Sequence, residues 1–259
     1  MSDPPSVAPR RGAPAGLFLA IDTAGAEGSV AIGHRSGVSH RQPETRLEIL
    51  AGTTLRPDEE HASLLLPRVQ DLLGEVGAGV GDLSGVVVGS GPGSFTGVRV
   101  GAATAKGLAW ALNLPLWAFS SLAAAAADVD DDPFRPRLVL FDARGDRVYA
   151  AAYRVARGSM DTLLAPRATT VGEVLDELLP PGALLMGDGA LKHQALLQGA
   201  GNLVLPPPAG RPSARGLLRL LSLDAEAAPL DDLGRWEPDY LRESGAERMW
   251  KTRTGWEGP

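Results

Sequence analysis

A strand, a glycine-rich loop and a helix follow one another without interruption in the middle of this chain, and this succession constrains the fold more than any other feature. The three valines Val86 to Val88 predict a buried strand. The loop GSGPGSFTG, residues 89–97, comes directly after them, and a helical stretch then runs to about Leu112. Because alternating strands and helices form sheets covered by helices, the succession predicts an α/β protein.

The same sequence pattern occurs at the start of each half of the chain. The apolar run Leu17 to Ile21 ends at Asp22, and the run Leu138 to Phe141 ends at Asp142. A turn that contains glycine and a returning strand follow each aspartate, as in a strand hairpin. We therefore expect two related halves, each of which begins with a strand ending in Asp.

Other elements are predicted from the spacing of apolar residues. A third strand is expected at Leu47 to Leu55, and helices at 171–179, 191–197 and 214–223. One further helix has a regular apolar face, ends at Gly77, and carries Ala62, Leu65, Leu66, Val69, Leu72, Leu73 and Val76 at helical spacing.

The length of 259 residues exceeds what one small core needs, so we expect two domains with flanking segments. Residues 1–16 are Pro-rich and are expected to be a disordered tail. Residues 17–118 and 119–226 are expected to form an N-terminal and a C-terminal lobe. Residues 227–259 are expected to pack on these lobes as a C-terminal segment.

Composition excludes several classes of protein. The chain has 25 basic and 31 acidic residues, a net charge of −6, and no segment in which basic residues gather, which argues against a nucleic-acid surface of its own. No apolar run reaches the ~20 residues that a membrane span needs. The absence of cysteine excludes disulfides and thiolate chemistry and fits a reducing compartment. We expect a soluble, cytoplasmic protein.

The glycine loop has two interpretations. Glycines after a strand let backbone N–H groups approach a phosphate at a helix N-terminus, which makes Gly91 and Gly93 candidates for a phosphate site. However, the loop lacks the Lys-Ser/Thr pair of a P-loop, and Ser94 stands where a dinucleotide fingerprint has its last glycine. The alternative is a tight turn that lets the strand and the helix pack closely.

The helix after the loop has one face with almost no side-chain bulk. Its residues Gly97, Gly101, Ala105 and Ala109 are small and spaced four apart. Another backbone can therefore come very close to this face. The spacing does not tell whether that backbone belongs to the protein's own sheet or to a partner.

No metal site or nucleophile is predicted. The histidines His34, His40, His61 and His193 form no metal-binding pair, and there is no cysteine to complete a set. Ser120 has no local base and is better explained as a helix cap. We expect no metal and no cofactor.

Several motifs together resemble one known family. They are AIDTAGAEGSVAI (20–32), HASLLLPRVQDLL (61–73), GSGPGSFTGVRVGAATAKGLAWAL (89–112) and EPDYLR (237–242). In this order they resemble the TsaB (YeaZ) family, the non-catalytic subunits of the bacterial machinery that makes threonylcarbamoyladenosine in tRNA. The motif GPGSFTGVR is specific to that group, and the set covers nearly the whole chain.

The resemblance implies an actin-like (ASKHA) fold of two related lobes of mixed sheet flanked by helices. In that fold, carboxylates at the ends of corresponding strands surround a metal-bound phosphate. A vestigial phosphate or nucleotide site is therefore implied at Asp22, Thr23, Gly91, Gly93 and Asp142. Ala24 and Arg144 occupy turns that need glycine for phosphate approach, which disfavours a working clamp.

The resemblance also implies a role and partners. TsaB pairs with TsaD, the subunit that transfers the threonylcarbamoyl group to the adenosine beside the anticodon, and the ATPase TsaE joins the assembly. The metal-binding histidines of TsaD are absent from the corresponding stretch 118–127, and residues 142–147 replace its phosphate loop. The chain is therefore expected to be non-catalytic, and to meet tRNA only through the complex.

In this family the first two helices of the N-terminal lobe form the pairing surface, with TsaD or in a homodimer. The residues expected at or beside this surface are Leu65, Val69, Leu72, Gly97, Gly101 and Ala105. The apolar stripe of the first helix could equally face its own core. The alternative function is an active ATP-dependent kinase or ATPase of the actin-like fold, against which the turns at Ala24 and Arg144 argue. A peptidase has no supporting residues.

Overall fold

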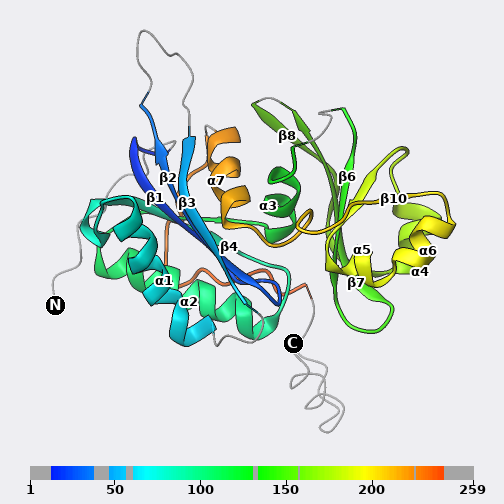
Figure 1. Ribbon diagram of the computed structural model, residues 1–259, viewed down its shortest axis with the longest axis horizontal. Helices are drawn as coiled ribbons and strands as arrows, with labels where there is room; N and C mark the ends of the chain where they lie inside the picture. The colour runs from blue at the N-terminus through cyan, green and yellow to red at the C-terminus, as the bar shows by residue number, and fades with distance from the viewer. Residues whose placement is uncertain are drawn as a thin grey trace, which may run out of the picture.

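Two five-stranded sheets lie side by side in the protein, with helices on their faces (Figure 1). The computed structural model describes residues 13–37, 47–56, 61–130, 134–156, 158–224 and 226–241. Residues 1–12 of the expected tail, the histidine His40, and everything after Leu241 lie outside these described residues.

The first sheet mixes antiparallel and parallel strands. It contains β1 (Gly16–Asp22), β2 (Gly28–Arg35), β3 (Leu47–Leu55), β4 (Leu83–Gly89) and β5 (Leu116–Phe119) in the order β3-β2-β1-β4-β5. Strands β1, β2 and β3 are antiparallel neighbours, whereas β4 runs parallel to β1 and β5 parallel to β4. In this register Ala20 lies between Ala31 and Val87, at the centre of the sheet.

The second sheet repeats this plan. It contains β6 (Arg137–Asp142), β7 (Arg147–Ala156), β8 (Ser159–Thr170), β9 (Leu184–Met186) and β10 (Leu203–Val204) in the order β10-β9-β6-β7-β8. Counted within each half, both sheets have the order third, second, first, fourth, fifth, with a central strand ending at Asp22 or Asp142. The predicted duplication and the actin-like fold class are confirmed by this topology.

Helices cover both faces of the first sheet. Helices α1 (His61–Glu75) and α2 (Phe95–Ala111) pack on one face, and α7 (Ala214–Leu223) packs on the other. The expected ranges place α7 in the C-terminal lobe, yet its leucines contact Phe18 and Ala31 of the first sheet. Sequence position alone could not reveal this, because α7 returns to the first half after the second sheet is complete.

The second sheet carries shorter helices. Helix α3 (Ser121–Ala127) packs on one of its faces, and α4 (Val171–Glu173), a π-helical turn (Val174–Leu178), α5 (Asp188–Lys192) and α6 (Gln194–Gly199) lie at the other. The prediction of one helix at 191–197 is wrong: α5 ends at Lys192 and α6 begins at Gln194, with His193 between them. The start of α5 is held to β6, because Asp188 accepts a hydrogen bond from the backbone N–H of Asp142 at 3.0 Å.

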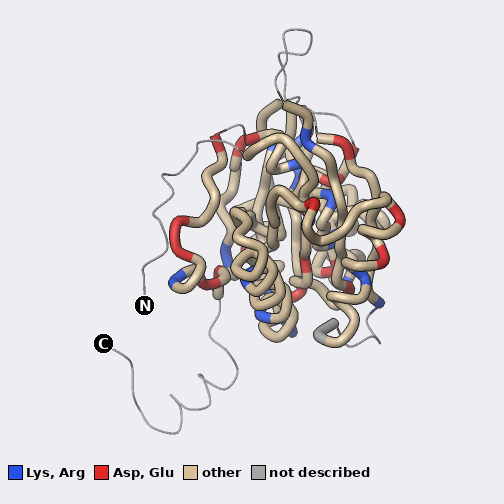
Figure 2. Tube along the Cα trace, turned by 90° about the vertical axis from the view of Figure 1, so that its left-hand side faces the viewer, with Lys and Arg blue, Asp and Glu red and all other residues tan. Residues whose placement is uncertain are grey.

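A 3-10 turn at Val80–Asp82 leads into β4. Within the described ranges, no helix combines the length and apolar character required to cross a bilayer. Basic and acidic residues are scattered along the trace in the side view, and the described residues seen there show no long basic run (Figure 2).

Candidate functional site

A cleft of about 450 Å³ lies between the two halves, at the ends of strands β1 and β6. The glycine loop and the start of α2 form one wall, and the turn between β6 and β7 forms the opposite wall. Residues Asp239, Tyr240 and Leu241 line the mouth. In the actin-like fold this cleft is where a phosphate ligand would bind, so the candidate phosphate residues can be judged here.

The glycine loop is used for packing against the first hairpin. A Cβ at Gly93 would lie 2.2 Å from the carbonyl oxygen of Ala24, and the N–H of Ser94 donates to that same oxygen at 2.7 Å. The hydroxyl of Ser94 accepts from Gly97 N–H at 3.3 Å and caps α2. Gly91 has φ +91°, which favours glycine, so the loop conformation itself requires this residue.

Asp22 is sealed inside the protein. Its exposed fraction is 0%, it does not line the cleft, and its Oδ1 accepts hydrogen bonds from Ser121 Oγ at 3.0 Å and Ala24 N–H at 3.1 Å. Oδ2 has no hydrogen-bond partner among the described residues. Burial raises the pKa of Asp22 to about 6. Thr23 is buried as well and donates to the carbonyl of Gly97 at 2.7 Å.

Asp142 lies in the cleft but is already paired. Its Oδ1 is 2.7 Å from Lys192 Nζ and accepts the N–H of Arg144 at 2.9 Å. Arg144 adopts φ +70°, an unusual conformation for a residue with a side chain. Nearby, burial raises the pKa of Asp188, and the Asp142 carboxylate raises it further.

These features leave a cleft poorly suited to a nucleotide. Among the described residues, three carboxylates, Asp142, Asp188 and Asp239, line the cleft with one arginine, Arg144, so a polyphosphate would meet net negative charge from them. The carboxylate of the first half is also enclosed. Among the residues that the structure describes, no three side chains of His, Asp or Glu gather in a way that could hold a metal ion.

The six residues expected at a partner surface are buried against the protein's own sheet. The exposed fractions of Leu65, Val69 and Leu72 are 0 to 3%, and these side chains belong to the core between α1 and the first sheet. A Cβ at Gly97 would lie 2.1 Å from Thr23 O, and one at Gly101 would lie 2.3 Å from Thr23 Oγ1. Ala105 is fully buried. This prediction is therefore corrected: the small face of α2 contacts its own first strand.

The outward faces of the two helices carry other residues. Trp110 on α2 is 82% exposed and Leu66 on α1 is 49% exposed. Ala103 and Gly107 are exposed on α2 between the loop and Trp110, and no atom of the described residues lies within 4 Å of a Cβ built at Gly107. The spacing of apolar and small residues predicts both helices, but it points to the buried stripe as the partner surface because that stripe is the more regular one.

The C-terminal segment lies against the first half of the protein. We call its residues 226–241 the strap. The N–H of Leu230 donates to Leu116 O at 2.8 Å, which places the segment at the edge strand β5. Farther along, Ser90 Oγ donates to Asp239 Oδ2 at 2.6 Å, and the N–H of Asp239 donates to Ser90 O at 2.8 Å. The strap thus holds the first residue after β4, where the glycine loop starts.

Arg99 and two aromatic rings fasten the strap to α2. The guanidinium of Arg99 lies 3.7 Å from the ring centroid of Phe95, and its Nε donates to Tyr240 Oη at 3.2 Å. Lys106 Nζ donates to the carbonyl of Trp236 at 2.5 Å. The motif at 237–242 indicated this segment. Its place over the loop follows only from the tertiary structure.

Comparison with known proteins gives a consistent result. The family model of TsaD, tRNA N6-adenosine threonylcarbamoyltransferase, matches residues 49–212. TsaB of Bacillus subtilis (strain 168), a tRNA threonylcarbamoyladenosine biosynthesis protein, is 34% identical over 198 residues, which cover 74% of this chain and 84% of that protein. A tRNA N6-adenosine threonylcarbamoyltransferase of Streptococcus mutans is 32% identical over 130 residues, which cover 47% of this chain and 38% of that protein.

Two solved structures from Pseudomonas aeruginosa have the same architecture. A protein described as similar to peptidase YEAZ is 27% identical with a TM-score of 0.70, covering 88% of this chain and 100% of that one. YeaZ is 25% identical with a TM-score of 0.67, covering 87% of this chain and 100% of that one.

The doubled sheet and the enclosed strand-end carboxylate define a protein of the actin-like class in which the aspartate of the first half is buried away from the cleft. With the matches above, the chain belongs to the TsaB family, within the wider group described by the TsaD family model.

Proposed function

We propose that the chain is the non-catalytic subunit that pairs with a TsaD protein in the cytoplasm and supports threonylcarbamoyl transfer to the tRNA adenosine next to the anticodon. The observation that carries the non-catalytic role is the enclosure of Asp22, which has an exposed fraction of 0% and no access to the cleft. A carboxylate in that state cannot coordinate a metal-bound phosphate, so the chemistry belongs to the partner.

The outward face of α1 and α2 is the proposed contact with TsaD. Trp110 and Leu66 are large apolar side chains exposed to solvent, and Trp is among the residue types enriched at the energetic centre of interfaces. The small residues Ala103 and Gly107 let a partner helix approach the α2 backbone closely. The same face would serve a homodimer when TsaD is absent. TsaE is proposed to join the pair in a ternary assembly.

An active kinase or ATPase, the alternative function, gains no support from the cleft. Lys192 and the Arg144 backbone both contact Oδ1 of Asp142, and the charge of the described lining residues is negative. Contact with tRNA is proposed to occur only through the complex, because the chain carries a net charge of −6 without a basic stripe.

Reconstitution tests the proposal directly. Cognate TsaD, TsaE and the synthase that makes the threonylcarbamoyl adenylate are combined with tRNA, threonine, bicarbonate and ATP, with and without this chain. We expect modified tRNA to form only when the chain is present. Equal modification without it would refute the supporting role, and ATP turnover by the isolated chain would refute the non-catalytic one.

A further inference from the structure

Helices α3 and α7 belong to different halves of the protein and touch each other between the two sheets (Figure 1). Helix α3 packs on the second sheet, and α7 packs on the first. The two helices come very close at Gly216, where a Cβ would lie 2.0 Å from the carbonyl oxygen of Ala124. The two backbones are therefore in direct contact, and this position has no room for a side chain.

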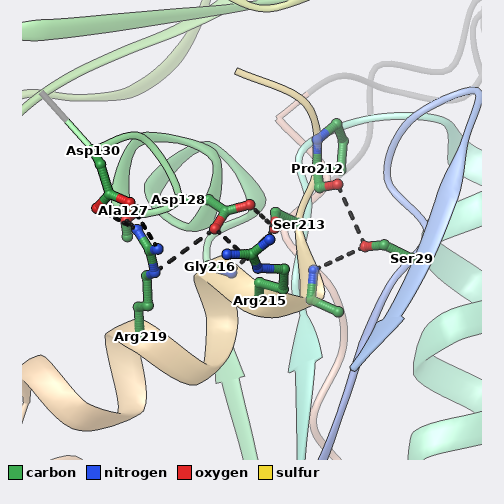
Figure 3. Close-up of polar contacts among 10 residues, drawn as sticks. Ser29, Ala127, Asp128, Asp130, Pro212, Ser213, Arg215, Gly216 and Arg219 are labelled. Atoms are coloured by element: carbon green, nitrogen blue, oxygen red, sulfur yellow. Dashed lines mark hydrogen bonds and ion pairs between the residues drawn. The ribbon is translucent and has the colours of Figure 1, made fainter. Parts of the chain in front are cut away.

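The ends of the two helices are joined by side chains at the same place. Asp128 follows the last residue of α3, and Ser213 precedes the first residue of α7. The hydroxyl of Ser213 donates to Asp128 Oδ2 at 2.7 Å and accepts the N–H of Gly216 at 3.1 Å (Figure 3). Because a hydroxyl has one proton, its donation to Asp128 directs a lone pair toward the first turn of α7.

Arg219 of α7 completes the end of α3. Its Nη1 donates to the carbonyl of Ala127 at 3.0 Å and to Asp130 Oδ1 at 3.1 Å, and its Nε lies 3.7 Å from Asp128 Oδ1 (Figure 3). A carbonyl in the last turn of a helix has no hydrogen-bond donor within the helix. The guanidinium of Arg219 supplies that donor to the carbonyl of Ala127, and its positive charge is favourable at a helix C-terminus. The side chains of Arg219 and Asp128 are only 26% and 25% exposed, which reduces screening of their charges by solvent.

A third element fixes the start of α7. Ser29 on β2 accepts the N–H of Ala214 at 2.8 Å and donates to the carbonyl of Pro212 at 3.4 Å (Figure 3). The first turn of α7 is thus bound to the first sheet on one side and to α3 on the other. A change in the angle between the halves would break several of these bonds together.

We propose that this contact, which we call the α3–α7 lock and define as Ala124, Asp128, Ser213, Gly216 and Arg219, holds the two halves in one relative orientation and makes them unfold as one unit. Proteins with two lobes around a cleft commonly close it by hinge or shear motion. The lock opposes such motion here, so the cleft keeps one width and α1 and α2 are presented on a rigid body. This inference does not depend on the proposed function.

A distance measurement tests the orientation. Because the chain contains no cysteine, the double variant Gln70→Cys/Gln194→Cys carries spin labels only at one exposed site on α1 and one on α6. We expect one narrow interlabel distance distribution in the otherwise native chain. Adding Asp128→Ala and Arg219→Ala is expected to widen it at least twofold. A broad distribution in the native background, or no widening on these substitutions, would overturn the proposal.

Calorimetry of the full chain tests the coupling. The native protein is expected to give one unfolding transition, and Asp128→Ala/Arg219→Ala is expected to give two. Arg68→Ala/Asp71→Ala, which removes an ion pair of 3.9 Å within α1, is the matched control and should keep one transition. If the double variant fails to fold, Asp128→Asn replaces it, since an amide oxygen still accepts from Ser213 while the charge is lost. If Asp128→Asn gives a single unfolding transition and an unchanged interlabel distance distribution, the proposal of the lock is also rejected.

Discussion

The hydroxyl of Ser121 donates a 3.0 Å hydrogen bond to Oδ1 of Asp22, a residue 99 positions earlier in the chain. This bond joins the end of β1 to the first turn of α3 inside the protein. It shows how the strand-end aspartate is held: the carboxyl is enclosed and paired with the fold itself, not presented to the cleft.

The first prediction concerns this carboxyl and pH. The pKa of Asp22 is about 6 in the folded protein against 3.8 for an ordinary Asp. A raised pKa means that the folded state binds the proton more tightly, so the contribution of Asp22 to stability is greatest below pH 4 and is lost as pH rises to about 6 and beyond. The cost at neutral pH is on the order of 3 kcal/mol.

Asp22→Asn removes this pH dependence while retaining an oxygen for Ser121. We expect the free energy of unfolding of the variant, relative to native protein, to increase by roughly 2 kcal/mol between pH 4 and pH 7.5. Urea unfolding at both pH values measures it, with exposed Asp231→Asn as the control. A difference that stays constant with pH would show that Asp22 is not a strained buried acid.

A second prediction separates two glycines of α2. Gly97→Ala places a Cβ 2.1 Å from Thr23 O and is expected to lower the free energy of unfolding by roughly 1–3 kcal/mol or more. Gly107→Ala meets no atom of the described residues within 4 Å and should raise the free energy of unfolding by about 0.5–1 kcal/mol through helix propensity. Chemical denaturation of both variants measures these changes in the free energy of unfolding. If both substitutions change it in the same direction, the assigned faces of α2 are contradicted.

A third prediction concerns the partner surface. Trp110→Ala removes a side chain that is 82% exposed, so the fold should remain intact, while affinity for TsaD should fall at least tenfold if Trp110 anchors the interface. Titration calorimetry with purified TsaD gives the dissociation constant. Leu196→Ala, 55% exposed on α6 in the other half, is the control and should bind normally. If the native chain and both variants bind TsaD with equal affinity, the interface does not include the outward face of α2.

A fourth prediction addresses the strap. Asp239→Ala removes the carboxylate that accepts the 2.6 Å bond from Ser90, so backbone amides of residues 89–97 should exchange with solvent deuterium faster, by roughly tenfold for each 1.4 kcal/mol lost. Glu237→Ala, at an exposed position two residues earlier, is the comparison. Unchanged exchange in the loop after Asp239→Ala would mean that the strap does not support it.

Much of the architecture could be predicted from the sequence. The strand, glycine loop and helix at 86–112 and the paired openings that end at Asp22 and Asp142 all lie where local pattern places them. The strand predicted at 47–55 matches β3. These elements could be predicted because each depends on the spacing of apolar residues and glycines within a short stretch of sequence.

The site residues could not be predicted in the same way. Gly101 and Gly107 are both glycines of one helix, and periodicity assigns each to a face, but it does not tell which face meets the sheet. Contact with Thr23 decides that Gly101 is buried, and open space decides that Gly107 is not. A substitution at Gly101 would thus disturb the fold before it tested any partner.

By itself the sequence determined the type and order of most elements, the duplication and the family motifs, because these follow from residues that are neighbours along the chain. Only the tertiary structure decided that Asp22 is enclosed, that α7 returns to the first sheet, and that Asp128 joins two helices of different halves. The physical reason is that burial and pairing depend on which distant segments meet, and residues such as Ser121 and Ser213 carry no local sign of the partners that they acquire on folding.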